Sequence, residues 1–154
     1  MNAGASPTSS ALRTVEESAV RLLAGREHSV RELRQKLCAR GHDESLVDDV
    51  LRSLCERNLL SESRFIESFV RSRAERGQGP MRIRAELRER GIDDERIDAC
   101  VTRAADYWLE RLERVRVKRF GVGAPATRDD WNRQARFLAQ RGYPSDLIYR
   151  ALGR

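Results

Sequence analysis

Apolar residues along this chain recur every three to four positions, which is the spacing of one face of an α-helix. In the first third of the chain, three runs with this spacing follow one another. Their inner residues are Val15, Ala19, Val20 and Leu23, then Leu33 and Leu37, then Leu46, Val47, Val50, Leu51 and Leu54. The pattern predicts three amphipathic helices, the first starting near Thr14, the second capped by Ser29 and the third starting near Asp43.

The segment LCARGHDESLVDDVL in the first third returns twice in modified form, as LRERGIDDERIDACV and LAQRGYPSDLIYRAL. Each copy places an Arg-Gly pair between two helical runs, and the glycines Gly41, Gly91 and Gly142 are 50 and 51 residues apart. A glycine that follows a helix can take the left-handed conformation that closes the helix end. An aspartate two residues later, Asp43 or Asp93, can cap the next helix. The three glycines are therefore predicted to be structural turns.

A period of about 50 residues is typical of an array of supersecondary units. We therefore expect an all-α fold, an elongated tandem array of three three-helix repeats formed by residues 11–60, 61–110 and 111–154. Residues 1–10, MNAGASPTSS, are predicted to be a disordered N-terminal tail.

One helix is expected to be much longer than the others. No helix breaker occurs from Asp94 until Gly121, and Ile97, Val101 and Trp108 continue one apolar stripe. We expect a single helix of about 27 residues here, which would join the second repeat to the third.

The composition favours a binding protein over an enzyme with a deep pocket. Charged residues make up 35% of the chain and aromatic residues 6%, so the core must be thin and aliphatic. The formal net charge is +6, with the excess located after residue 60, and an acidic partner is the natural complement. Lysine occurs only at Lys36 and Lys118, so nearly all basic residues are arginines, a preference that a GC-rich genome would also produce.

Residues for catalysis or metal binding are scarce. No phosphate-binding glycine loop is present, His28 and His42 are the only histidines, and the three cysteines have no metal-ligand spacing. We expect no catalytic, metal or cofactor site. No apolar stretch reaches the roughly 20 residues that span a bilayer, and the N-terminus does not resemble a signal peptide, so a cytoplasmic protein without a membrane role is expected.

Basic residues give the one positive indication of a binding surface. They gather in the predicted helices after residue 60, and the candidates are Arg64, Arg71, Arg73, Arg76, Arg82, Arg84, Arg88, Arg111, Arg114 and Lys118. Helical spacing places Arg73, Arg76, Arg84 and Arg88 largely outside the apolar stripe of the second repeat, which includes Phe69. Such residues often form a merely solvated face, and contact with acidic groups of a partner is the alternative.

Three segments resemble the RecX family of bacterial regulatory proteins: LLAGREHSVRELRQKL, SRFIESFVRSRAERGQGPMRIRAELRERGI and FLAQRGYPSDLIYRAL. The resemblance implies tandem three-helix repeats and a non-enzymatic modulator of RecA in recombination, DNA repair and the SOS response. Such a protein would bind as a monomer in the groove of the RecA nucleoprotein filament and lower its ATPase, strand-exchange and co-protease activities. Single- or double-stranded DNA would be a further partner. Two rival readings remain: a sequence-nonspecific DNA-binding helical module, and an enzyme with an unrecognised site.

Overall fold

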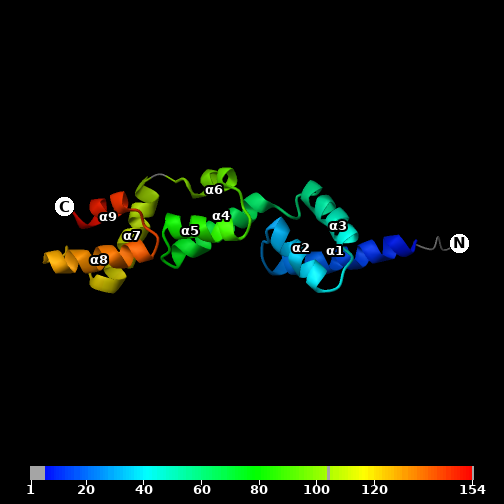
Figure 1. The fold of residues 1–154 in the computed structure, drawn as a ribbon, viewed down its shortest axis with the longest axis horizontal. Helices are drawn as coiled ribbons and strands as arrows, with labels where there is room; N and C mark the ends of the chain where they lie inside the picture. Colours follow the sequence, from blue (N-terminus) through cyan, green and yellow to red (C-terminus); the bar gives the residue numbers. More distant parts are fainter. Residues whose placement is uncertain (1–5, 104, 154) are drawn as a thin grey trace. The chain divides into compact units, whose positions relative to one another are not determined.

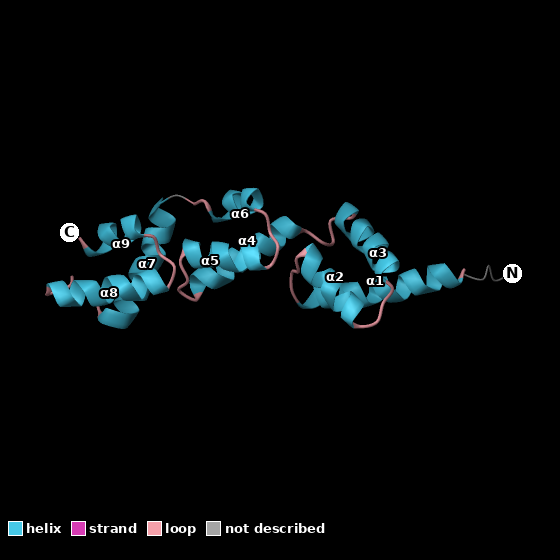
Figure 2. Ribbon diagram, in the orientation of Figure 1, coloured by secondary structure: helices cyan, strands magenta, loops and turns pink. Residues whose placement is uncertain are grey.

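The computed structural model describes residues 6–103 and 105–153, and within that part of the chain every regular element is a helix (Figures 1 and 2). The predicted all-α class is therefore confirmed. The helices are α1 (Pro7–Gly25), α2 (Val30–Ala39), α3 (Glu44–Glu56), α4 (Glu62–Glu75), α5 (Pro80–Glu89), α6 (Asp94–Val101), α7 (Ala105–Phe120), α8 (Arg128–Gln140) and α9 (Ser145–Leu152).

The predicted glycine turns and aspartate caps are confirmed. Gly41, Gly91 and Gly142 all have left-handed backbones, with φ angles of 86°, 79° and 96°. The Asp43 carboxylate accepts hydrogen bonds from the backbone N–H groups of the first turn of α3, and Asp93 does the same for α6. Each Arg-Gly pair thus ends one helix, and a residue shortly after it begins the next.

The chain divides into two compact units, residues 1–66 and 67–154, and the boundary between them falls inside α4. In the first unit, α1, α2 and α3 pack against one another as a three-helix bundle. Its core is aliphatic, as the low aromatic content requires. The buried residues are Val15, Ala19, Leu33, Leu37, Val47, Val50, Leu51, Leu54 and Leu60.

A buried histidine joins α1 to α2 in the first unit. His28 is 1% exposed, and its two ring nitrogens lie 2.9 Å from the backbone oxygen of Arg26 and 3.0 Å from Nζ of Lys36. A neutral imidazole fits both contacts, because Nδ1–H can donate to the carbonyl while Nε2 accepts from the ammonium group. Burial lowers the pKa of His28, and the positive charges of Arg26 and Lys36 act in the same direction, while the hydrogen bond to the Arg26 carbonyl and the charge of Glu32 oppose them. His28 is therefore a structural residue.

In the second unit, two turns meet backbone to backbone. The N–H of Gly79, just before α5, donates to the backbone oxygen of Arg141 at 2.7 Å, and the N–H of Met81 donates to that of Gly142 at 3.0 Å. A methyl group on Gly79 would lie 2.5 Å from the Gly142 oxygen, and one on Gly142 would lie 2.5 Å from Cβ of Arg82. Only glycine at both positions allows this approach, which fastens the second repeat to the third.

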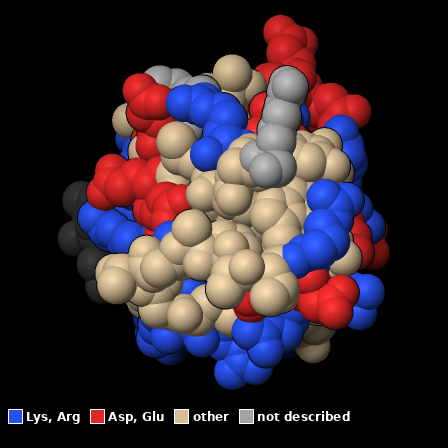
Figure 3. All heavy atoms as spheres, turned by 90° about the vertical axis from the view of Figure 1, so that its left-hand side faces the viewer, with Lys and Arg blue, Asp and Glu red and all other residues tan. Residues whose placement is uncertain are grey.

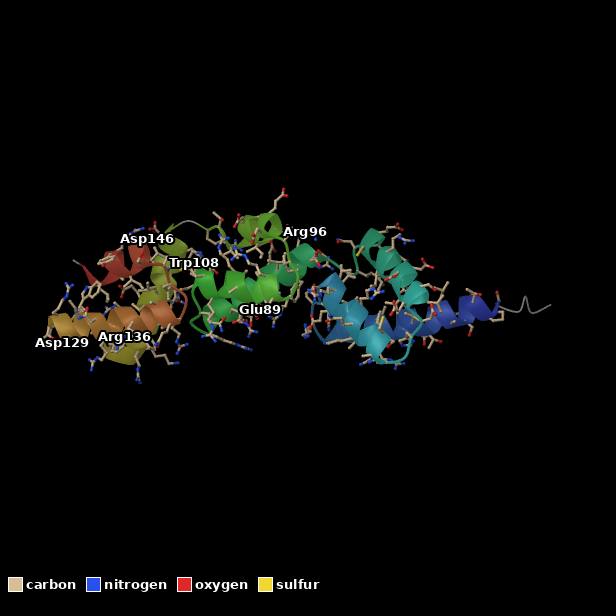
Figure 4. All side chains as sticks on the ribbon, viewed as in Figure 1. Glu89, Arg96, Trp108, Asp129, Arg136 and Asp146 are labelled. Atoms are coloured by element: carbon tan, nitrogen blue, oxygen red, sulfur yellow. The ribbon has the colours of Figure 1, made fainter. Side chains whose placement is uncertain are left out.

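The prediction of one long helix joining these repeats is wrong. The chain leaves helical geometry at Thr102, whose φ and ψ are −68° and 104°, so α6 and α7 are separate helices. They have different neighbours, because α6 packs on α5 whereas α7 packs on α8 and α9. Trp108 on α7 (labelled in Figure 4) donates its indole N–H to the oxygen of Val101 at 3.2 Å, which satisfies a carbonyl left free at the end of α6.

The expected disordered tail is also partly wrong. Pro7–Ser10 form the first turn of α1, with Pro7 at the helix start, where its fixed φ is favourable and its missing N–H is not needed. Residues 1–5 of that tail lie outside the described part of the chain.

The stability of the protein should fall as the pH is lowered below about 6.5 because of His28. The folded state holds this histidine at a lowered pKa, so the unfolded chain binds its proton first and gains free energy as the solution becomes acidic. Urea unfolding at pH 8 and pH 5.5, followed by circular dichroism, should show a smaller free energy of unfolding at pH 5.5. His28→Gln should remove most of this difference, and His42 remains in that variant as a control. An equal pH dependence in the variant would contradict the assignment.

Gly79→Ala should lower the free energy of unfolding by about 1–3 kcal/mol, the usual cost of forcing atoms into a packed site. Gly123→Ala is the matched control, because nothing lies within 4 Å of a methyl group there and its φ is not left-handed. Urea unfolding of the two variants measures the difference. Equal midpoints would show that the two turns do not pack closely.

Candidate functional site

Six of the ten predicted interface residues form ion pairs inside the chain. Arg64 pairs with Glu27 at 3.0 Å, Arg73 with Glu86 at 3.0 Å, Arg82 with Glu86 at 3.6 Å, Arg88 with Asp94 at 2.6 Å and Arg114 with Glu110 at 2.6 Å, while Arg84 pairs with Asp98. Exposed ion pairs contribute little stability, but each one partly neutralises the charge that a partner would meet. These arginines therefore do not form one uniform basic face.

Arg73 lies against the apolar stripe instead of outside it. Its guanidinium carbon is 4.7 Å from the centre of the Phe69 ring, and Arg90 approaches the same ring at 4.7 Å. The Arg73 side chain is only 23% exposed. The predicted position of Arg73 outside the apolar stripe is therefore wrong, and the reason is a cation–π contact that helical spacing alone does not reveal.

Basic residues from three parts of the second unit meet around a groove of about 390 Å³. We call it the basic groove. Its lining consists of Glu75, Arg76, Gly77, Arg114, Val115, Lys118, Arg119, Phe137 and Arg141. Five of these side chains are cationic and one is acidic, so the groove favours an anionic ligand.

Helix ends and the glycine contact position the residues of the basic groove. α4 ends at Glu75, and the left-handed Gly77, with a φ of 87°, turns the chain so closely against Val115 that a side chain at position 77 would not fit. Arg141 ends α8 beside the docked turn, and its guanidinium lies 3.5 Å from the backbone oxygen of Arg76. α7 supplies the remaining basic residues from successive turns.

Four of the five cations of the basic groove, Arg76, Lys118, Arg119 and Arg141, have no carboxylate partner among residues 6–103 and 105–153. No Asp or Glu of residues 6–103 and 105–153 pairs with Lys118 or Arg119, and both side chains are exposed. Figure 3 looks onto the side where α8 and α9 lie, and Lys and Arg side chains gather along its lower edge. Together with Arg76, which is also exposed, these two residues carry the charge that is most available to a ligand.

The basic surface continues from the groove onto α8. Arg133 and Arg136, the latter labelled in Figure 4, line a second hollow that shares Phe137 with the basic groove. Asp129 also lines this hollow, and Arg133 pairs with Asp130 at 2.6 Å, so its charge is partly neutralised. Phe137 packs edge to face with Phe120 at 5.3 Å, and Arg133 lies 5.6 Å from the centre of the Phe120 ring. The Phe120–Phe137 pair thus supports basic side chains on both sides.

The basic groove contains three of the predicted interface residues, Arg76, Arg114 and Lys118. Arg71 is exposed elsewhere on α4, and the guanidinium carbon of Arg111 lies 3.4 Å from the centre of the Tyr107 ring. The sequence reasoning missed Arg119 and Arg141 of the groove, and Arg133 and Arg136 of the neighbouring hollow. The spacing of Arg133, Arg136 and Gln140, which matches that of Arg111, Arg114 and Lys118, could have indicated a polar face on α8.

The part of the chain that the structure describes contains neither a candidate metal site nor a candidate membrane-spanning helix. No group of three or more His, Cys, Asp or Glu side chains there is arranged to hold a metal ion. No helix among those residues is long and apolar enough to cross a bilayer.

Comparison with known families and structures identifies all three repeats. The first, second and third three-helix domains of RecX match residues 17–54, 61–101 and 105–152. The chain resembles a crystal structure of RecX from Lactobacillus salivarius with a TM-score of 0.79, covering 92% of this chain and 94% of that one at 20% identity, which supports the fold.

Two relatives carry the family assignment. The Regulatory protein RecX of Halorhodospira halophila is 51% identical over 143 residues, covering 93% of this chain and 89% of the relative. That of Pseudomonas savastanoi pv. phaseolicola is 44% identical over 138 residues, covering 90% and 89%. The order of the three domains, the fold and these identities agree, and the chain belongs to the RecX family of regulatory proteins.

Proposed function

We propose that this protein binds the RecA nucleoprotein filament and lowers its ATPase, strand-exchange and co-protease activities. The observation that carries the proposal is the 51% identity to a Regulatory protein RecX over 93% of the chain. In this role the protein would restrain recombination, DNA repair and the SOS response. It would act in the cytoplasm as a monomer, without catalysis or a cofactor.

The arrangement of charge supports binding to a repetitive acidic partner. Three helical repeats in one chain can contact successive subunits of a filament, and linked contacts that are weak individually add up to tight binding. The basic groove gives the second unit a concentrated positive surface that includes Arg76, Lys118 and Arg119. A steered, salt-dependent encounter with a negatively charged surface is the expected result.

The basic groove is also compatible with a second candidate function, that of a sequence-nonspecific DNA-binding module. Phosphates are as suitable as carboxylates for the planar fork of arginine. The amounts needed for inhibition separate the two functions, because a DNA binder must coat the DNA whereas a filament regulator acts at fewer sites.

RecA ATPase on circular single-stranded DNA should be inhibited at concentrations of this protein far below those that coat the DNA. Filament binding predicts half-inhibition at a small fraction of the RecA concentration. The concentration of this protein at half-inhibition, the midpoint, should rise with the RecA concentration and not with the DNA concentration. A midpoint that rises in proportion to added DNA at constant RecA would favour the DNA-binding module. The absence of inhibition up to one regulator per RecA would refute the proposal.

A charge reversal in the basic groove should weaken this inhibition. Arg76→Glu, Lys118→Glu and Arg119→Glu together remove three contacts worth about 0.5–1 kcal/mol each and add repulsion, so half-inhibition should need at least about tenfold more protein.

The matched control combines Arg13→Glu, Arg21→Glu and Arg31→Glu, which are exposed positions of the first unit. It carries the same change in net charge and should weaken inhibition clearly less than the groove variant, because it leaves the basic groove intact. Both variants should retain their helical circular dichroism and melting. A folded groove variant with wild-type inhibition would exclude this surface from the interface.

A further inference from the structure

We infer that the basic groove is the docking site for an acidic peptide segment that also carries an apolar side chain. The inference rests on the proposed function and deepens it, because it specifies the chemistry of the partner surface that the second unit recognises. It follows from three features of the groove: its cationic rim, its apolar floor and the way its aromatic ring is covered.

The rim supplies several separate positions for carboxylates. Arg76 follows the end of α4, Arg141 follows the end of α8, and Lys118 and Arg119 lie on α7, so these positive charges do not lie along one helix. Glu75 is the only acidic residue of the lining, and Arg114 is already paired with Glu110 at 2.6 Å. An extended segment with more than one Asp or Glu would match this charge distribution.

The floor is apolar. Val115 and Phe137 line the groove, both partly exposed, and Gly77 contributes no side chain that would cover Val115. Phosphate groups gain nothing from such a floor, whereas a leucine-like side chain between two acidic residues would bury apolar surface against it. The combination of a charged rim and an apolar floor is the usual make-up of a peptide-binding interface.

The aromatic ring in the groove is poorly placed to stack with a nucleic-acid base. The guanidinium of Arg141 lies over the Phe137 ring, 5.1 Å from its centre, and Phe120 meets the same ring edge to face at 5.3 Å. Single-stranded nucleic acid is usually held by bases that stack on open aromatic faces. The geometry therefore favours a peptide over an oligonucleotide as the occupant.

Nuclear magnetic resonance of the full-length ¹⁵N-labelled protein tests the inference directly. The probe is a blocked eight-residue peptide of alternating aspartate and leucine, compared with the same peptide carrying serine in place of leucine and with an eight-nucleotide oligothymidylate. The leucine peptide should cause saturable shifts of the backbone amides of Gly77 and Val115. The serine peptide should bind at least about threefold more weakly, as expected for lost burial of apolar side chains.

Two variants complete the design. The double variant Lys118→Glu and Arg119→Glu should bind the leucine peptide at least about tenfold more weakly. The double variant Arg13→Glu and Arg21→Glu, which makes the same charge change in the first unit, should leave binding of this peptide unchanged. The spectra of both variants report directly whether the fold is intact.

Three results would overturn the inference: no shifts at Gly77 and Val115, equal binding of the serine peptide, or tighter saturation of the groove by the oligothymidylate. The titration contains no recombinase, so any of these results can be obtained while inhibition of RecA ATPase remains intact. Conversely, peptide binding without ATPase inhibition would remove the proposed function and leave the groove as a peptide site.

Discussion

The second unit depends on the contact between two backbones, the turn before α5 and the turn after α8. Gly79 and Gly142 meet there without side chains, and two backbone hydrogen bonds, at 2.7 and 3.0 Å, join the turns. Because the contact involves main-chain atoms, no rearrangement of side chains can relieve a substitution. The same contact brings Arg141 next to Arg76, so the docking that holds the second and third repeats together also forms the basic groove.

The repeated Arg-Gly pair has a different structural role in different repeats. Gly41 and Gly142 share the left-handed backbone that ends a helix, but nothing lies within 4 Å of a methyl group placed on Gly41. Gly142, in contrast, ends its helix and also accepts a neighbouring turn. The first repeat is instead held together by its aliphatic core, and the buried His28 contacts Lys36 of α2. A sequence repeat thus preserves the local turn, while the tertiary role of each copy depends on what packs against it.

Most of the local structure could be predicted from the sequence, because helix caps and left-handed glycines are decided by a few neighbouring residues. The separation of α6 from α7 could not, since the apolar stripe runs on past Val101 and only the packing of α6 on α5 requires a break. The site was predicted least well. Whether an arginine is available depends on carboxylates distant in sequence, such as Glu86 for Arg73 and Asp98 for Arg84, and Arg141 joins the groove only through docking.

Amide hydrogen exchange at Gly79 and Met81 tests most directly whether the two turns are docked in solution. Both N–H groups donate to backbone oxygens of the opposite turn. Our account predicts that they exchange as slowly as the amide of Leu112 in the core of the same unit, because they open only when the unit unfolds. Exchange at the rate of the exposed loop around Val122 would contradict it, since the second and third repeats would then be joined only by the chain.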